Sequence, residues 1–171
     1  MRRTQIRPVR CGDEAAFRRF LAGLSLHTQT LRFFTGVGRP PASLLTALMA
    51  VDERRDALVA VHEGEIVGHA MSYRGARADD VEIAVVVTDQ WQGIGLGPRL
   101  IDTLLTRAAI RGATTVGMDV LGENRRALRL IRRAWPDAKL RVSSGSVEVT
   151  AMIKQAVVFA EQRSVGSPLT A

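Results

Sequence analysis

The stretch VEIAVVVTDQWQGIGLGPRLIDTLLTRAAIR, residues 81–111, decides the fold of this chain. Residues 81–87 are almost wholly apolar and β-branched, which is typical of a strand that is covered on both faces. Three glycines lie within residues 92–97, and Pro98 suits the first position of a helix. From Leu100 the apolar residues recur with a period of about 3.6 residues, which is typical of an amphipathic helix. The stretch therefore predicts a strand, a glycine-rich turn and a helix.

The glycine-rich turn has the physical character of an anion site. The N–H groups in the first turn of a helix lack intrahelical partners, and the helix dipole places about half a positive charge there. Glycines let a phosphate approach these groups without meeting a Cβ atom. A Walker loop would require a lysine that is missing here, and Pro98 takes the third-glycine position of a dinucleotide-binding loop. Neither of these nucleotide motifs fits.

The pattern Gln92-x-x-Gly95-x-Gly97 directly after a strand resembles motif A of the GCN5-related N-acetyltransferases, the GNAT family. That family holds the pyrophosphate of acetyl-CoA on this turn and pairs the pantetheine arm with the backbone of the preceding strand. The resemblance spans residues 6–153, and the alternative is a turn that serves only strand-to-helix geometry. The cofactor-binding residues that it implies are Val85, Val86, Val87, Gln92, Gly93, Ile94, Gly95, Leu96, Gly97, Pro98 and Asn124.

The resemblance also implies the fold and the cofactor. The fold is α/β, with a central mixed, mostly antiparallel sheet flanked by helices and with a splayed strand pair that binds acetyl-CoA. Acetyl-CoA is the implied co-substrate, and no metal is expected. His27, His62 and His69 show no metal-ligand spacing, so each is interpreted as structural.

Length and composition indicate one globular domain, residues 1–154, followed by a tail, residues 155–171. Of the 171 residues, 46% are hydrophobic and 24% are charged, which is ordinary for a globular protein. No apolar run approaches the ~20 residues that span a bilayer, and the N-terminus lacks the apolar core of a signal peptide. The single cysteine, Cys11, suits a reducing compartment. We therefore expect a cytoplasmic protein without a membrane partner.

The net charge of +7 comes almost entirely from arginines that are dispersed along the chain. A basic surface can attract nucleic acid, but the chain has neither an RNP signature nor zinc-ligand spacing. Nucleic acid is therefore not expected as a partner. The positive field is compatible with a ligand that carries several phosphates, and a genome biased towards arginine codons explains it equally well.

Local patterns predict the remaining elements. A glycine- and glutamate-rich turn at residues 63–65 indicates a hairpin, and Asp13 and Ser43 are suited to cap helices. In the second helix, Arg32, Phe33 and Phe34 either line the acceptor cleft, as the resemblance implies, or pack in the core. The predicted strands are 5–10, 57–62, 66–73, 81–87, 115–121, 139–143 and 146–153, and the predicted helices are 14–22, 26–34, 44–51, one from Pro98 to about residue 111, and 123–134.

Glu82 is the candidate general base, since it is the only charged side chain in residues 81–87. Burial in this strand would disfavour the carboxylate and raise its pKa toward the useful range. An amine with a pKa of about 10.4 needs such a base, because reaching the neutral form at pH 7 costs roughly 4.6 kcal/mol. Many enzymes of the resembled family place a glutamate base here. The alternative is a solvent-facing glutamate at the entry of the strand.

Asn124 opens the segment Asn124-x-x-Ala127, which is similar to motif B of the same family. In that family the asparagine often binds the CoA arm, and a tyrosine further along protonates the leaving thiolate. Here Ile131 stands at the tyrosine position, so the general acid is in question and water could protonate the thiolate. Tyr73, the only tyrosine in the sequence, is expected in the core. The alternative to CoA binding for Asn124 is that it caps the N-terminus of the following helix.

The combined pattern resembles the acetyltransferase domain of bacterial protein lysine acetyltransferases of the Pat type. The resemblance implies direct transfer of an acetyl group from acetyl-CoA to an amine, with a protein lysine as the first choice of acceptor. A small-molecule amine is the second choice. The third interpretation is a non-catalytic acetyl-CoA-binding module, which the missing motif-B tyrosine permits.

Overall fold

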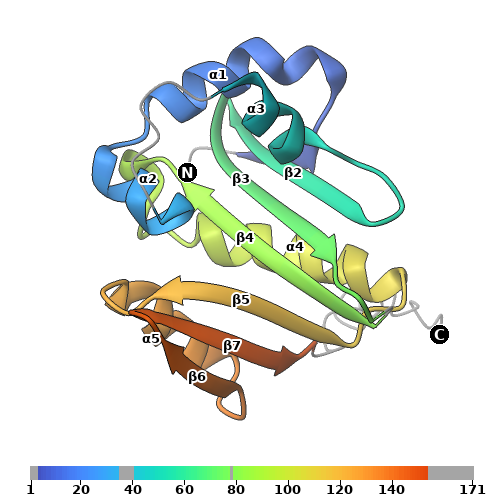
Figure 1. Ribbon diagram of the computed structural model, residues 1–171. Helices are drawn as coiled ribbons and strands as arrows, with labels where there is room; N and C mark the ends of the chain where they lie inside the picture. The colour runs from blue at the N-terminus through green and yellow to red at the C-terminus, as the bar shows by residue number, and fades with distance from the viewer. Residues whose placement is uncertain (1–3, 35–40, 78, 154–171) are drawn as a thin grey trace, which may run out of the picture.

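The computed structural model describes residues 4–34, 41–77 and 79–153, which form a seven-stranded sheet in the order β1-β2-β3-β4-β5-β7-β6 (Figure 1). Every neighbouring pair of strands is antiparallel except β4 and β5, which run parallel. The predicted mixed, mostly antiparallel sheet is confirmed. The strands are β1 (Gln5–Pro8), β2 (Arg55–His62), β3 (Glu65–Arg74), β4 (Asp80–Val87), β5 (Thr115–Leu121), β6 (Lys139–Ser143) and β7 (Ser146–Met152).

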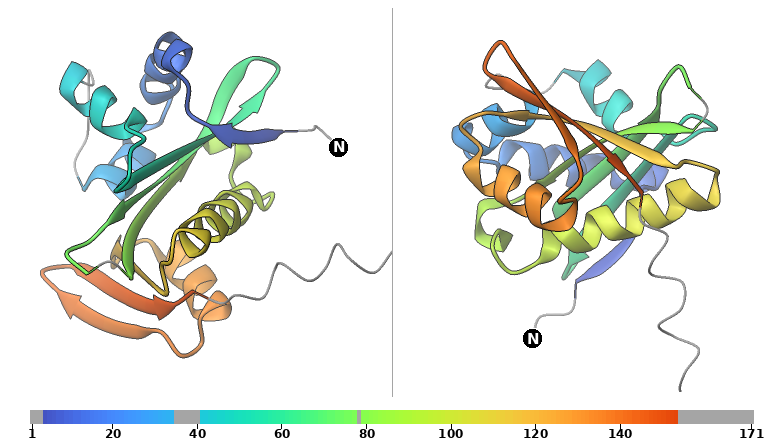
Figure 2. Two further views of the ribbon diagram at one scale, coloured as in Figure 1. Left: turned by 90° about the vertical axis from the view of Figure 1, so that its right-hand side faces the viewer. Right: turned by 90° about the horizontal axis from the view of Figure 1, so that it is seen from below.

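Helices cover both faces of the sheet. Figure 2 shows α1 to α3 on one face, α4 on the opposite face, and α5 against the part of the sheet that β5, β6 and β7 form. Two short 3-10 helices, η1 (Cys11–Asp13) and η2 (Asp89–Trp91), connect strands to helices. The α-helices are α1 (Glu14–Ala22), α2 (Leu26–Phe33), α3 (Ala42–Met49), α4 (Leu96–Ile110) and α5 (Arg125–Ala134).

Strand β4 lies at the centre of the sheet, and its side chains point alternately into two hydrophobic cores, one on each face. Ile83 and its odd-numbered neighbours pack with Leu100 and Leu104 of α4. Val86 packs on the other face with Phe17 of α1. Each fully buried side chain of this kind contributes roughly 1.5–3 kcal/mol to stability. The uninterrupted apolar run in the sequence follows from this double coverage.

Strands β4 and β5 separate after a short paired region. Residues 80–82 of β4 pair with residues 115–117 of β5, and the pairing ends there. In contrast, β4 stays paired with β3 up to Val87. Figure 1 shows β4 and β5 diverging toward their C-terminal ends. The predicted splayed pair is therefore confirmed, and the edge of β4 that faces β5 is open beyond Glu82.

Several predicted element boundaries were wrong. Helix α4 begins at Leu96 after Gly95, so Pro98 is its third residue and not its first. Helix α3 begins at Ala42 after the extended backbone of Pro41, so Ser43 lies inside the helix. Strand β1 ends at Pro8, two residues before the predicted end, and α5 begins at Arg125, two residues after the predicted start at 123. A helix can be capped by backbone conformation alone, which the search for polar capping residues misses.

Two ion pairs hold elements together. Asp13 does not cap α1 with its side chain, because its carboxylate accepts hydrogen bonds from both Nη atoms of Arg7, each at 2.7 Å. This hydrogen bonding from Arg7 lowers the pKa of Asp13 from its ordinary value. Asp56 of β2, which is buried, accepts from Nε of Arg107 of α4 at 2.6 Å, and Arg111 lies 3.7 Å away. The second pair fixes α4 across the sheet.

The described ranges end at residue 153, so the predicted tail, residues 155–171, lies outside them. Among the helices in those ranges, none combines the length and apolar character that crossing a bilayer requires.

Candidate functional site

A cavity of about 950 Å³ occupies the space where β4 and β5 diverge. Leu31 and Arg32 of α2 line it from one face of the sheet, and residues of α4 and α5 line it from the other. The cavity therefore passes between the two strands. Such a passage lets two reactants approach one point from opposite faces of a sheet.

The cavity gathers only some of the predicted residues. Val85, Gly97, Pro98 and Asn124 contribute to its lining, together with many apolar side chains. Val86 instead packs in the core beneath α1. The other predicted residues are not among the lining residues; these are Glu82, Val87, Gln92, Gly93, Ile94, Gly95 and Leu96.

The glycine-rich turn presents backbone donors to open space. Gly93 and Gly95 have φ values of +85° and +86°, a conformation that side chains rarely adopt. A Cβ atom added at Gly95 or Gly97 would meet no protein atom within 4 Å. Leu96 is buried and anchors the start of α4, whereas Ile94 is exposed. The N–H groups of Leu96 and Gly97 are in the first helical turn, where they have no intrahelical acceptor.

The side chain of Gln92 connects the turn to two other elements. Its Nε2 donates to the carbonyl of Val87 at 3.1 Å and to Oγ1 of Thr28 at 3.2 Å. Asp89 accepts from Oγ of Ser25 at 2.7 Å and from Oγ1 of Thr28 at 2.8 Å. Burial by itself raises the pKa of Asp89, but the hydrogen bonds from Ser25 and Thr28 bring it below its ordinary value. The turn and the start of α2 are therefore one connected unit.

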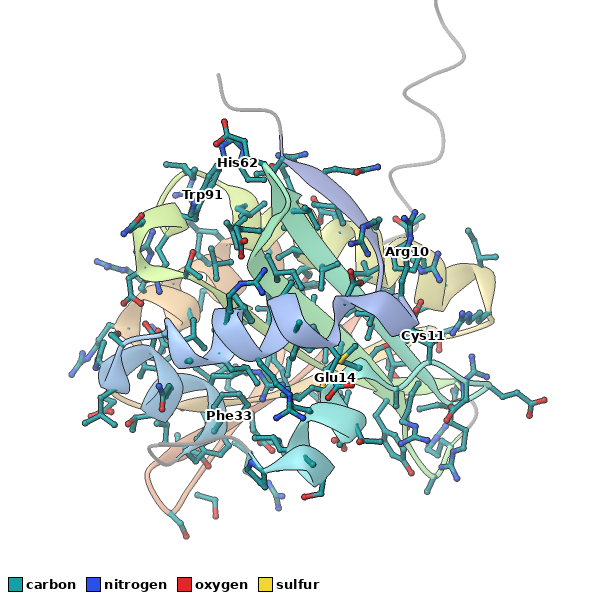
Figure 3. All side chains as sticks on the ribbon, turned by 90° about the horizontal axis from the view of Figure 1, so that it is seen from above. Arg10, Cys11, Glu14, Phe33, His62 and Trp91 are labelled. Carbon is teal, nitrogen blue, oxygen red and sulfur yellow. The ribbon has the colours of Figure 1, made fainter. Side chains whose placement is uncertain are left out.

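Two further contacts lie at the turn or next to it. The ring of Trp91 lies 4.7 Å from the ring of His62, and Figure 3 shows the pair at one edge of the molecule, away from Phe33. Nη2 of Arg126 lies 2.8 Å from the position of a Cβ atom on Gly93. Arg126 is one of the five arginines of α5. Its contact with the turn adds a positive charge beside the start of α4.

Asn124 combines two roles that the sequence presented as alternatives. Its Oδ1 accepts from the backbone N–H of Ala127 at 3.1 Å, which caps α5. The same residue also lines the cavity. Ile131, at the position where motif B carries a tyrosine, is buried and lines the cavity too. No hydroxyl group is therefore available there to protonate a leaving group.

Glu82 is exposed, so the prediction that it is buried was wrong. Even-numbered positions of β4 face α1 to α3, but this layer buries Val86 and leaves the start of the strand open. The Cγ atom of Glu82 lies 3.6 Å from the position of a Cβ atom on Gly117 of β5. Because Gly117 has no side chain, Glu82 extends across the last paired position, next to the divergence of the strands.

Two residues near Glu82 were missed or misplaced by sequence reasoning. Asp119 lies on β5 two residues after Gly117, is exposed and lines the cavity. Tyr73 is directly opposite Glu82 on β3 and 41% exposed, so its predicted place in the core was wrong. Asp119 gave no sequence signal because its place in the cavity lining depends on how β5 lies beside β4.

The three residues of the second predicted helix that were expected at the acceptor cleft or in the core lie in different environments. Arg32 lines the cavity, Phe33 packs against the core beneath α1, and Phe34 is 48% exposed. His69 is structural, as predicted: it is buried, its Nε2 lies 2.9 Å from the carbonyl of Leu48, and burial lowers its pKa to about 3. Across the described ranges, no three His, Cys, Asp or Glu side chains form a group suited to a metal ion.

The model of the acetyltransferase (GNAT) family matches residues 25–135, which is more than half of the chain. The chain belongs to the GNAT family. The match contains α2, the splayed strand β4, the glycine-rich turn and α5, so it covers the elements that build the cavity. The resemblance that motifs A and B suggested is confirmed.

Individual GNAT proteins are similar to this chain to different extents. An acetyltransferase of Pseudomonas aeruginosa is 34% identical over 116 residues, and the match covers 65% of this chain and 62% of that protein. The GNAT domain of Streptomyces lividans PAT superposes with a TM-score of 0.80 at 23% identity, over 87% of this chain and 90% of that one. The yncA protein of Salmonella typhimurium, solved with its cofactor acetyl-CoA, has a TM-score of 0.67 at 18% identity, over 90% and 96%. The two structures support the GNAT fold.

Proposed function

We propose that this chain is an acetyl-CoA-dependent N-acetyltransferase and that its acceptor is the side-chain amine of a protein lysine. The observation that carries the acetyl transfer is the cavity between β4 and β5, which connects the α4 side of the sheet with the α2 side. The choice of lysine is supported by the resemblance to Pat-type enzymes and by the similarity to the GNAT domain of PAT. A lysine side chain, with its apolar stem and terminal amine, also suits a mainly apolar passage.

Acetyl-CoA would bind from the α4 side. The backbone N–H groups of Leu96 and Gly97 would receive the pyrophosphate, and Arg126 would add positive charge. The open edge of β4 at Val85 would pair with the polar groups of the pantetheine arm, as a further strand does. In this binding mode the thioester would lie where the strands diverge, just past the last paired position, Glu82.

The acceptor would enter from the α2 side and lose a proton to Glu82, directly or through one water. The neutral nitrogen attacks the carbonyl carbon of the thioester, so an N–C bond forms and the C–S bond breaks. The nitrogen loses its second proton to solvent as the amide forms, and CoA leaves as a thiolate that is protonated from solvent, since Ile131 offers no proton. The exposed position of Glu82 allows a water-mediated route for the first proton.

The test compares two carboxylates that lie on neighbouring strands. Thiol release from acetyl-CoA is measured with a panel of lysine peptides and, separately, with small amines, for the wild type, Glu82→Gln and Asp119→Asn. We expect Glu82→Gln to lower kcat about 10²- to 10⁴-fold, as is usual for loss of a general base, and Asp119→Asn to lower it less than about tenfold. Acetyl-CoA affinity should stay unchanged in both.

Three results would contradict parts of this proposal. Near-normal turnover by Glu82→Gln, or a larger loss in Asp119→Asn, would remove Glu82 from the role of base. Turnover of small amines without turnover of any peptide would replace lysine with a small-molecule acceptor. Acetyl-CoA binding without thiol release for any acceptor would favour the non-catalytic module.

A further inference from the structure

Arg32 stands out among the arginines because its charged group is enclosed and also has no carboxylate partner in the described part of the chain. Its Nη2 lies 3.4 Å from Sδ of Met71, and its guanidinium carbon lies 4.9 Å from the centre of the Phe33 ring. Its Nε is enclosed and meets no acceptor. Burial lowers the pKa of Arg32 to about 10, which leaves the side chain charged at neutral pH. The described residues around the cationic group therefore offer it a sulfur contact and an aromatic contact, and no carboxylate.

Outside the described ranges the sequence has one acidic side chain, Glu161. Residues 35–40, which follow α2 and lie outside the described ranges, read TGVGRP and contain no acidic side chain. A partly enclosed cation without a counterion is costly, so such an arrangement is typical of a site that receives an anion from a ligand. Guanidinium binds carboxylates especially well because its donors match their two oxygens.

The location of Arg32 identifies which ligand could bring the anion. Arg32 lines the cavity from α2, and it contacts Met71, whose partner across the β3–β4 ladder is Ala84. Ala84 lies two residues after Glu82 and points to the same face of the sheet. The glycine-rich turn receives its phosphates at the start of α4, on the opposite face. The acceptor is therefore the ligand that approaches Arg32.

The wall that carries Arg32 is fixed in position. Ser25 caps α2 through the N–H of Thr28, and Asp89 accepts hydrogen bonds from the side chains of both residues. Because Asp89 follows β4 directly, the helix is tied to the strand that would hold the thioester. A guanidinium in a fixed position can select an acceptor by where the acceptor carries a negative charge, and not only by the presence of that charge.

We propose that Arg32 binds a carboxylate carried by the acceptor, namely an acidic side chain close in sequence to the target lysine. This inference rests on the proposed acetyl transfer to lysine. The same chemistry fits the carboxylate of a free amino acid, and the experiment separates the two sources. Arg32 acts as a specificity residue for the acceptor and has no role in binding acetyl-CoA.

The test is a cycle of two changes, one in the enzyme and one in the substrate. Lysine peptides with glutamate at each position within three residues of the lysine are compared with their glutamine counterparts, using the wild type, Arg32→Gln and Arg32→Lys. Arg18→Gln is the control, since Arg18 is an exposed arginine that pairs with Glu14 on α1. Free lysine and lysine amide form the small-molecule arm.

For the wild type we expect one glutamate position to raise kcat/KM about 10- to 100-fold over glutamine, the range of a hydrogen-bonded charge pair. Arg32→Gln should abolish this preference, so that its kcat/KM values for the glutamate and glutamine peptides become equal through a loss confined mainly to the glutamate peptide, and Arg18→Gln should behave as the wild type. Arg32→Lys should keep part of the preference. A preference seen only between free lysine and its amide would support the anion site and overturn the peptide as its source.

Two outcomes would overturn the inference. Equal loss of turnover for glutamate and glutamine peptides in Arg32→Gln would show that Arg32 acts on the reaction itself. Equal kcat/KM values for both peptides in the wild type would show that the enzyme does not recognise a carboxylate on the acceptor. Calorimetry on the acetyl-CoA-loaded protein measures the affinities of the glutamate and glutamine peptides, so the two can also be compared for a peptide that is not turned over. Melting temperatures of all variants show whether each variant is folded. An enzyme that releases no thiol with any acceptor refutes the proposed function, whereas an active enzyme without carboxylate preference refutes only this inference.

Discussion

Replacing Gly95 by alanine tests the anion site at the start of α4 with an internal reference. Gly95 has φ of +86°, and Gly112, just past the other end of the same helix, has φ of +90°. A Cβ atom at either position would meet no protein atom within 4 Å. The two substitutions therefore impose the same backbone strain and no clash. They differ in that only the open space at Gly95 adjoins the N–H groups of Leu96 and Gly97.

The expected magnitudes separate folding from binding. A non-glycine residue in the left-handed region costs about 1–2 kcal/mol, so both variants should lose this much stability. For a domain of this size, that corresponds to a melting temperature lower by roughly 2–8 °C. Hydrogen bonds to a charged group are worth about 1.5–3 kcal/mol, and losing one phosphate contact should weaken acetyl-CoA binding roughly 10- to 150-fold. Gly112→Ala should bind acetyl-CoA as the wild type does.

Thermal melting with and without acetyl-CoA measures both quantities at once. A ligand at a concentration of 100 times its Kd stabilises by about 2.7 kcal/mol, so the wild type and Gly112→Ala should show the same rise in melting temperature. At that concentration acetyl-CoA should stabilise Gly95→Ala by only about 0.3–1.4 kcal/mol, so its melting temperature should rise less, and calorimetry gives the affinity directly. If Gly95→Ala gained as much from acetyl-CoA as Gly112→Ala did, the phosphates would not bind at this turn.

Two predictions concern stability. His69 is neutral in the folded protein at neutral pH, because its pKa is about 3 there against about 6.5 in the unfolded chain. The unfolded chain therefore binds a proton first as the pH falls. The contribution of His69 to the free energy of unfolding is full above pH 6.5 and decreases by about 1.4 kcal/mol per pH unit below it. Denaturant titrations between pH 7 and 5 should show a shallower loss for His69→Gln, and equal slopes would exclude His69 as the source. Asp56→Asn should cost about 2 kcal/mol because it leaves the partly buried Arg107 unpaired, whereas Asp52→Asn, at an exposed pair, should cost below about 1 kcal/mol. Equal denaturation midpoints for these two variants would contradict the role of the Asp56 pair.

Local patterns in the sequence were sufficient to find most elements. The limits of β5 and β6 were predicted to the residue, because alternating side chains and turn residues define a strand over a short range. The glycine-rich turn was found for a similar reason, since positive φ and exposed helix N–H groups restrict which residues can occupy it. Helix starts were less accurate, as α3 and α4 are capped by backbone conformation and not by a polar side chain.

The burial of Glu82 could not be judged from its strand. The apolar neighbours of Glu82 are buried because α4 covers their face of β4, whereas the layer with α1 buries Val86 on the other face; coverage of each position depends on where distant helices lie. The same applies to Tyr73, which β3 places opposite Glu82, and to Asp119, which joins the cavity lining only through the placement of β5. A one-dimensional pattern carries no information about which strand lies alongside.

The sequence by itself determined the family, the strand–turn–helix that we propose as the anion site, and the absence of a tyrosine at position 131, because each depends on residues that are close in the chain. Only the tertiary structure decided that β4 and β5 separate after Glu82, that Asn124 both caps α5 and lines the cavity, and that Arg32 reaches the cavity from the far face without a carboxylate partner among the described residues. These features depend on register and on the packing of elements that are remote in sequence. The physical reason is that a cavity is the space left between packed elements, and its shape is fixed only when all of them are in place.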